Sequence, residues 1–583
     1  MNENQLSEEK LNDLIAFTKL YGYIKYFHPS SESEGVNWDA FAQYGTRKIL
    51  EAGSREEVIS TLNEIFSPIA PSLLIYSGDA DDEYPVDRYT PKDTTGYSLV
   101  MWIHDGHGTE TNRDKVENVY NSYITNSDTA DIKDIKIIEK DLGNGIKAKF
   151  PSVLYSNGKT FPTGNETKVT KFQRMLFEES KNNFVIDDKA YFIANVIITW
   201  NIFEHFFPYF DVIDEIASGQ TTRDEYWGNI LKKALKEAYN NESKKDHFVT
   251  LQHIVSALRD GHGFVSHDDI SKDRSRPPLK IEWIDNSPVV VKSNDDDKDI
   301  TEGDVITEID GRDVLELMEE IEERVSSSTV GYKKLLSTEI ELMRGEYESD
   351  ITLKVRKPDG KEVTKTFRRT EGTFPLINFP YYQNFLQIDS GIYYANLTKI
   401  KWEDLKDKLY TLANAKGIIF DLRGYPQVET YILLQHLYNT NINSSKWLIP
   451  RITEPDFKNV DFRESGVWDL SPLEPRINGE VVFLTNARAI SYSESIMAIV
   501  KNYHLGTIIG ERTAGTNGNV NRFLLPGGYQ ISFTGMKVLN HDDSRFHGIG
   551  VVPDIEVHKT IKGVSEKRDE QMEKALEFLK NSN

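Results

Sequence analysis

A serine at the start of a predicted helix is the residue of this sequence best placed for covalent chemistry. Ser491 lies in "AISYSESIMAIV", after a strand predicted over Val481 to Thr485 and where a helix is expected to begin. The first backbone N–H groups of a helix have no partner within the helix, and the helix dipole favours negative charge there. A hydroxyl at this point can attack a carbonyl whose oxyanion these N–H groups stabilise.

The same residues also fit a purely structural interpretation. Ser491 and Glu494 have the spacing of a capping box, in which the serine caps the helix and the glutamate bonds back to the cap. The two interpretations are compatible, because a nucleophile can cap its own helix. Ser493 and Ser495 are alternative nucleophiles by position.

A base for such a serine is offered by a tetrapeptide that occurs twice. Asp-Gly-His-Gly stands at 105–108 and again at 260–263. Histidine has an ordinary pKa of about 6.5, which makes it the usual base near neutral pH. The first copy follows a short strand, and its Asp-Gly pair is typical of a hairpin turn. The second copy follows a helix predicted from apolar spacing between Phe248 and Leu258, so His262 lies at the helix exit. The structural alternative is that His262 packs at a seam between domains.

Two similar helical segments are expected to position this histidine. Each has an aromatic helix that ends near a proline, then a tryptophan (Trp38 or Trp227), then an amphipathic helix. We predict two copies of one helical unit, residues 1–75 and 186–270, separated by a β-rich insertion over 76–185. The residue equivalent to His262 in the first copy is Leu73.

The second half of the chain predicts two further domains. Residues 271–370 contain "EGDVITEIDGRDV", which resembles a PDZ domain, a module that binds peptide ends by adding a strand to its sheet. The alternative is that this module only braces its neighbours. Residues 371–583 alternate strands with helices, which predicts an α/β core. The predicted fold class is therefore multidomain α/β.

Taken together, the motifs resemble the serine peptidases of the tail-specific, C-terminal processing and tricorn-core family. "KGIIFDLRGYP", "AISYSES", "GERTAGTNGN" and "HGIGVVPDIEV" match its segments in order. The resemblance implies a PDZ module beside a crotonase-like α/β core, and a serine endopeptidase that hydrolyses polypeptides. It also implies Ser491 as the nucleophile, with the oxyanion bound by the N–H of Tyr492 and that of Gly424 or Tyr425.

The resemblance also implies which base is used. The position of the base in the lysine branch of the family is Thr516 here, so a Ser–Lys dyad is not expected. The tricorn-like branch uses a histidine from the N-terminal part, and His262 falls on that position as general base. That branch has a glutamate where this sequence has His547. Three alternatives stay open. A carboxylate such as Glu511 or Asp260 orients the imidazole, His547 does so as a donor or acceptor, or the site is incomplete.

Composition limits the partners and cofactors. The net charge of −23 over 583 residues argues against nucleic acid or an anionic membrane surface as partner. The absence of cysteine excludes disulfides and thiolate metal sites, and no histidine pattern predicts a metal, so no cofactor is expected. The longest apolar stretch is too short for a bilayer span and is interpreted as a buried helix.

Two questions stay open at the level of sequence. No signal peptide is recognised at the N-terminus, although the resemblance implies a bacterial envelope, periplasmic or secreted location. Nothing indicates an oligomeric state.

The alternative function is a catalytically inactive relative that binds polypeptides or another ligand. Its basis is the missing lysine and the histidine at 547.

Overall fold

The structure is a computed structural model that describes nine stretches of the chain. They are residues 6–78, 84–108, 119–127, 132–182, 188–217, 222–270, 275–370, 383–427 and 429–582. The predicted domain boundaries near 185, 271 and 371 lie outside the described residues. The predicted boundary at 75 falls within strand β1, which pairs with β5 of the insertion, so the first helical unit and the insertion share a sheet.

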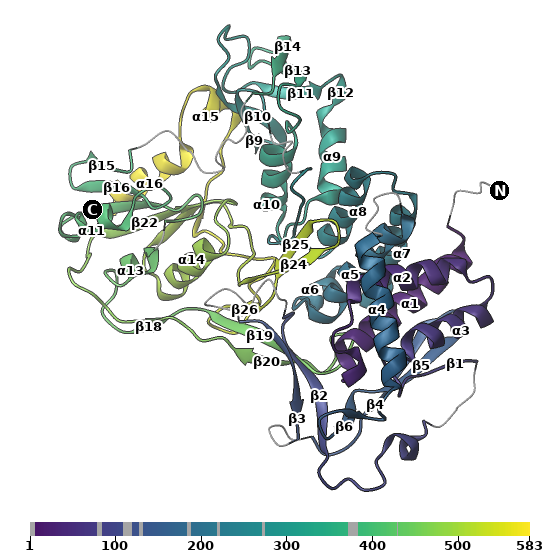
Figure 1. Cartoon of the computed structure of the whole chain (residues 1–583). Coiled ribbons are helices and arrows are strands. Elements are labelled where there is room, and N and C mark those ends of the chain that lie inside the picture. Colours follow the sequence, from purple (N-terminus) through teal and green to yellow (C-terminus); the bar gives the residue numbers. More distant parts are fainter. Residues whose placement is uncertain are drawn as a thin grey trace.

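Both predicted helical units consist of three long helices that pack into one aromatic core (Figure 1). The first contains α1 (Glu8–Phe27), η1 (Ser31–Ser33), α2 (Trp38–Glu51) and α3 (Arg55–Phe66). The second contains α5 (Lys189–Phe206), α6 (Phe210–Ala217), α7 (Arg223–Asn240) and α8 (Lys244–Ser256). Helices α1 and α5 cross so closely that a Cβ on Gly22 would lie 1.8 Å from Oδ1 of Asn201.

The predicted insertion contains several short strands and is not separate from the rest of the chain. It contains β1 (Leu74–Ser77), η2 (Val86–Tyr89), β2 (Ser98–Asp105), β3 (Asn121–Asn126), β4 (Ile137–Gly143), β5 (Ile146–Pro151), β6 (Val153–Ser156), β7 (Thr160–Phe161) and α4 (Glu166–Asn182). β2 pairs with β19 (Lys446–Ile452) of the C-terminal part, with Asp105 opposite Arg451. The two regions therefore share a sheet.

Residues 279–368 form a module with its own sheet and apolar core. The strand order is β14-β13-β11-β10-β9, and β12 pairs with β11. The elements are β9 (Leu279–Ile284), β10 (Ser287–Ser293), β11 (Val305–Ile309), β12 (Arg312–Asp313), α9 (Val314–Arg324), α10 (Val330–Leu335), η4 (Leu336–Glu341), β13 (Asp350–Arg356) and β14 (Glu362–Arg368). The turn predicted at Asp310 and Gly311 joins β11 to β12. The PDZ assignment of this module stays a prediction.

The C-terminal part is built on a mixed sheet with strand order β15-β16-β17-β22-β23-β27, parallel from β16 onward. Its strands are β15 (Phe385–Asp389), β16 (Ile392–Asn396), β17 (Gly417–Asp421), β22 (Glu480–Thr485), β23 (Thr507–Gly510) and β27 (Ile555–Glu556). Its helices are α11 (Trp402–Lys406), α12 (Leu409–Ala413), α13 (Thr430–Leu434), α14 (Tyr492–Tyr503), α15 (Ile561–Ser565) and α16 (Glu570–Asn581). Short strands β18 (Ile442–Asn443), β20 (Asp461–Glu464), β21 (Asp469–Leu470) and β26 (Lys537–Leu539) complete it. Two apolar clusters pack against this sheet. One contains side chains of α14 and the other contains side chains of α16, and each includes a different set of strand side chains.

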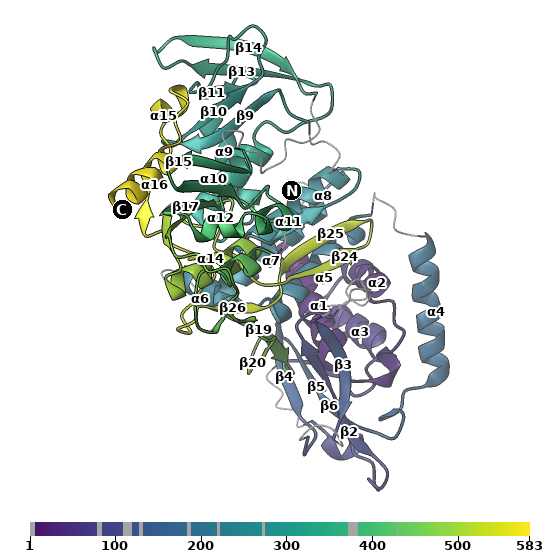
Figure 2. The same ribbon diagram turned by 90° about the vertical axis from the view of Figure 1, so that its left-hand side faces the viewer.

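One hairpin leaves this core and packs into the helical units. Strands β24 (Val520–Leu525) and β25 (Tyr529–Thr534) pair antiparallel, and β25 also pairs with β8 (Phe264–Ser266). In Figure 2 this hairpin reaches across to the helices of the N-terminal half. Phe533 lies 5.4 Å from Phe203 of α5, ring centre to ring centre. The predicted α/β core over 371–583 therefore shares part of its interior with the helical units.

The apolar stretch in α5 is a buried helix, as predicted from its length. All its residues from Ala190 to Phe206 are buried in the helical core. Within the described residues, no helix is both long and apolar enough to cross a membrane.

A buried arginine ties the end of β17 to the C-terminal helix. Arg423 lies 2.7 Å from Asp421 and 2.8 Å from Asp569, and all three side chains are buried. Against the effect of burial, Arg423 lowers the pKa of Asp569. Removing one partner of a buried ion pair leaves an uncompensated charge in the interior.

We expect Asp569→Asn to lower the free energy of unfolding by about 3 kcal/mol, because Arg423 loses its second carboxylate. Scanning calorimetry measures the change as a lower transition midpoint. The matched control is Asp543→Asn, which removes the exposed partner of Lys446 and is expected to leave the midpoint unchanged. Equal midpoints for the two variants would contradict the role given to Asp569.

Candidate active site

Three loops that follow parallel strands meet around Ser491. The loops after β17, β22 and β23 leave the carboxyl ends of neighbouring strands, the edge where open α/β sheets bind ligands. Ser491 ends the loop after β22 and caps α14 with φ of 58°, a strained conformation for a residue with a side chain. Its N–H donates to the Thr516 carbonyl at 2.9 Å.

A buried carboxylate fixes the backbone around the serine. Glu494 accepts hydrogen bonds from the N–H groups of Ser491, Gly515 and Thr516 and from the Thr513 hydroxyl, at 3.2, 2.6, 2.9 and 2.5 Å. Burial raises the pKa of Glu494 to about 8, and these donors oppose that rise. The predicted return contact of a capping box is thus present, and Glu494 joins the nucleophile loop to the loop after β23.

The two competing serines are occupied. Ser493 is buried and donates to the Gly424 carbonyl at 2.8 Å, and Ser495 is buried and bonded to Asn517. Of the three serines, only Ser491 is partly exposed. The Ser493 bond also brings the loop after β17 to the start of α14. Among the described residues, no hydrogen bond engages the N–H of Tyr492, Gly424 or Tyr425, the predicted oxyanion donors.

The sheet register places His262 opposite a threonine. β8 pairs antiparallel with β25, with Phe264 opposite Ser532, and the same register continued by two residues sets His262 opposite Thr534. Nδ1 of His262 lies 3.0 Å from the Thr534 hydroxyl oxygen, which lies 2.6 Å from Oδ1 of Asp260. Because the threonine donates its hydrogen to the carboxylate, it accepts from Nδ1–H. Nε2 of His262 is then left with a free lone pair.

Asp260 is the carboxylate behind this chain of bonds. It is fully buried and also accepts from the N–H groups of Thr534 and His262, at 2.5 and 3.1 Å. Burial lowers the pKa of His262 below its ordinary value, and the charge of Asp260 opposes that effect. The imidazole therefore stays neutral at neutral pH, as a base must be.

The glycines on either side of His262 are needed for close packing. A Cβ on Gly261 would lie 2.6 Å from the Thr516 hydroxyl, and one on Gly263 would lie 2.5 Å from the Ser326 hydroxyl. Neither glycine has a positive φ. The second Asp-Gly-His-Gly copy is thus wedged between the loop after β23 and the module.

Thr516 bridges the two predicted catalytic residues. Its hydroxyl accepts from the Gly261 N–H at 2.9 Å, and its carbonyl accepts from the Ser491 N–H. His262 and Ser491 thus lie on either side of one residue. Among the described residues, no hydrogen bond joins the Ser491 hydroxyl to His262, whose Nδ1 bonds to Thr534.

The two orienting residues singled out from sequence take other places. His547 stacks on Tyr209 with ring centres 3.9 Å apart, and its Nε2 lies 3.1 Å from the Arg259 carbonyl, so it braces the turn before Asp260. Glu511 contacts His558 at 3.7 Å. Within the described residues neither one forms a hydrogen bond to His262, although the charge of His547 contributes to the lowered pKa of His262. The orienting contact belongs to Thr534, which nothing in the sequence indicated, and to Asp260, which was among the alternatives.

The first Asp-Gly-His-Gly copy begins at the last residue of β2, Asp105, which pairs with Asn121 of β3. The connection is therefore longer than the tight hairpin turn expected at Asp105 and Gly106. Gly106 has φ of 65°, and Asp105 pairs with Arg451 at 3.0 Å. His107 is buried among aromatic rings, and burial lowers its pKa well below the ordinary value. In the described part of the chain, no group of histidines and carboxylates could hold a metal ion.

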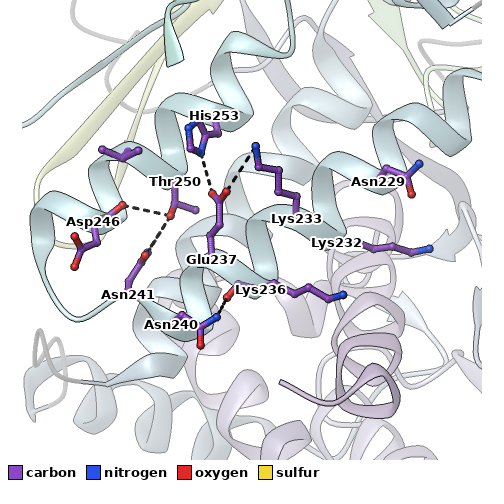
Figure 3. Close-up of a pocket in the computed structure, with 11 residues that line it drawn as sticks. Asn229, Lys232, Lys233, Lys236, Glu237, Asn240, Asn241, Asp246, Thr250 and His253 are labelled. Carbon is purple, nitrogen blue, oxygen red and sulfur yellow. Dashed lines mark hydrogen bonds and ion pairs between the residues drawn. The ribbon is translucent and has the colours of Figure 1, made fainter. Parts of the chain in front are cut away.

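An open groove of about 780 Å³ lies between α7 and α8 (Figure 3). Glu237 in this groove lies 3.0 Å from His253 and 3.8 Å from Lys233, whereas Lys236 pairs with Glu8 outside it. None of its lining residues belongs to the surroundings of Ser491.

Comparison with known proteins matches part of the chain to a family model and the fold to solved structures. Residues 391–557 match the model of Peptidase family S41. No curated protein matches the chain. The crystal structure of mature CPAF is similar, with a TM-score of 0.53 and 14% identity over 67% of this chain and 97% of that chain. Mature CPAF complexed with lactacystin gives 0.52 and 13% over 68% and 98%. The photosystem II D1 C-terminal processing protease gives 0.37 and 15% over 62% and 92%. The likeness to CPAF shows a shared fold.

The hydrogen bonds that link Asp260 through Thr534 to His262 predict how a change at Asp260 alters the pKa of His262. We expect Asp260→Asn to lower the pKa of His262 further, because the carboxylate that stabilises the imidazolium loses its charge. NMR of histidine-labelled protein across pH measures this shift. Glu511→Gln, which removes a carboxylate on the His558 side, is expected to leave the His262 titration unchanged. An unchanged pKa in Asp260→Asn would contradict the assigned contact.

Proposed function

Because residues 391–557 match Peptidase family S41, we propose that this chain is a serine peptidase in which Ser491 is the nucleophile and His262 the general base. The observation that carries the proposal is the bond sequence from Asp260 through Thr534 to His262, beside a partly exposed serine at a helix start. It leaves Nε2 of His262 as the free acceptor.

In the proposed first half-reaction, Nε2 of His262 takes the hydroxyl proton of Ser491 while Oγ attacks the peptide carbonyl. The oxyanion is stabilised by the N–H of Tyr492 and that of Gly424 or Tyr425. The imidazolium is stabilised through Thr534 by Asp260. It then gives its proton to the leaving amine, and the C–N bond breaks to leave an ester on Ser491.

In the second half-reaction, His262 takes a proton from water, which attacks the ester carbonyl. The tetrahedral intermediate collapses, Oγ of Ser491 regains the proton from His262, and a free carboxylic acid leaves. Apart from the substrate and one water molecule, each step uses only side chains and backbone N–H groups of this chain, so no cofactor is required.

The proposed substrate is a polypeptide, cut internally or near its C-terminus. The module over 279–368 is proposed to bind a polypeptide end in the manner of a PDZ domain, by adding a strand to its sheet. Export to a bacterial envelope, as the family resemblance implies, belongs to the same proposal.

We expect Ser491→Ala to lose at least about 10⁴-fold in the rate of cleavage of an unfolded protein, because the nucleophile is removed. A fluorophosphonate probe should label wild-type protein at Ser491, as identified by mass spectrometry, and labelling should be lost in His262→Ala. Ser390→Ala, in an exposed turn, is the control that keeps full activity. Wild-type protein that neither reacts with the probe nor cleaves would instead favour the inactive polypeptide-binding alternative.

The role of Thr534 as a positioning residue can be tested separately. Thr534→Val removes the hydroxyl between His262 and Asp260 at nearly constant volume. We expect kcat to fall by about 10- to 100-fold with KM unchanged. We also expect the acidic limb of the pH–rate profile to move to lower pH, because the imidazolium loses its link to the carboxylate. Thr534→Ser should restore both. An unchanged pH–rate profile in Thr534→Val would contradict the positioning role of Thr534.

A further inference from the structure

A second cavity lies in the N-terminal half, away from Ser491. It has a volume of about 880 Å³, which is within the usual range for small-ligand sites. Its walls come from the end of α1, the start of α2 and strands β2 and β3. None of the residues assigned to the peptidase site lines it.

One wall carries an ammonium group without a carboxylate partner. Lys25 is half-buried, and its Nζ lies 3.1 Å from the Tyr21 hydroxyl and 5.1 Å from the centre of the Tyr26 ring. No ion pair to Lys25 is found among the described residues. Burial lowers the pKa of Lys25, and the only opposing influence is Asp39.

The same cavity is lined by a carboxylate that also lacks a partner. Asp39 lies in the first turn of α2, and within the described residues its carboxylate accepts no hydrogen bond and forms no ion pair. Burial raises the pKa of Asp39, and Lys25 opposes that effect. The charge of each residue thus affects the pKa of the other, although the two form no ion pair. Both are therefore available to pair with a ligand.

The rest of the lining is aromatic, with unused polar atoms. Trp38, Trp102, Tyr26 and Phe523 contribute rings. The Tyr26 hydroxyl, Nε1 of Trp102 and Nδ1 of His107 are buried and have no hydrogen-bond partner among the residues that the structure describes. Buried polar groups are almost always satisfied in proteins, so three such atoms on residues of one cavity indicate that a polar partner completes it.

We propose that this cavity binds a short zwitterionic peptide, with the α-carboxylate of the peptide on Lys25, its α-ammonium on Asp39 and an aromatic side chain among the rings. Lys25 and Asp39 offer one charge of each sign, and Glu34 adds a solvent-exposed carboxylate to the lining. A zwitterion matches Lys25 and Asp39, since each of its charges leaves water only to meet its opposite. The proposal concerns binding alone and does not depend on Ser491 being a nucleophile.

The test uses the full chain with Ser491→Ala, so that no ligand is cleaved, and isothermal titration calorimetry with Gly-Phe. The comparison ligands are N-acetyl-Gly-Phe, which lacks the ammonium, and Gly-Phe-amide, which lacks the carboxylate. Gly-Phe is expected to bind with one site, and each blocked ligand at least about tenfold more weakly, because each loses one charged hydrogen bond. No binding of Gly-Phe, or equal binding of all three, overturns the proposal.

Two variants assign each charge to its partner. In Lys25→Met, Gly-Phe-amide should bind as tightly as Gly-Phe, because the lysine that contacts the carboxylate is gone. N-acetyl-Gly-Phe should still bind more weakly than Gly-Phe. Asp39→Asn should do the reverse. This crossed pattern does not arise from general damage to the fold, which would weaken all three ligands together. Variants in which the preference among the ligands stays as in the parent protein would refute the assignment of Lys25 and Asp39.

Discussion

The antiparallel pairing of β8 with β25 is the constraint on which the candidate active site depends. β8 has only three residues, Phe264–Ser266, yet its register sets His262 opposite Thr534. A slip by one residue would turn every side chain of a strand to the other face. The slip is opposed by Val265, which is buried in the helical core, and by the bonds of Asp260 to Thr534. The position of the imidazole is thus fixed by backbone pairing and one buried carboxylate.

This constraint means that no single domain contains the site. Ser491 and the proposed oxyanion donors belong to loops of the C-terminal part, whereas the imidazole and Asp260 follow α8 of the helical units. The hairpin β24–β25 joins the two, because Phe523 and Phe533 pack in the helical core while the strands continue from the C-terminal part. Folding of the helical units and assembly of the site are therefore coupled.

The residues that could be predicted from sequence are those with local signals. The strand and capping box around Ser491 and the helix before His262 have periodicity and cap spacing that lie within about 15 residues. Thr534 and Asp569 have no such signal, since their partners lie 272 and 146 residues away in the chain. The fold class followed from alternation of strands and helices. The shared sheets, such as β2 with β19, depend on tertiary pairing that no local pattern specifies.

The module over 279–368 is bound to the nucleophile loop by buried charges and hydroxyls. Arg488, in the loop before Ser491, lies 3.0 Å from Glu282 and 2.5 Å from Glu339 of the module. Burial would raise the pKa of Glu282, but Lys559 and Arg488 lower it to about 2. Ser328 adds a bond of 2.6 Å to the Thr516 hydroxyl, the same atom that accepts from Gly261. Separating the module would leave the buried charge of Arg488 without its two carboxylate partners, and it would remove the hydrogen bond between Ser328 and Thr516. A ligand that moves the module must therefore also move the two loops between which Ser491 and His262 are held.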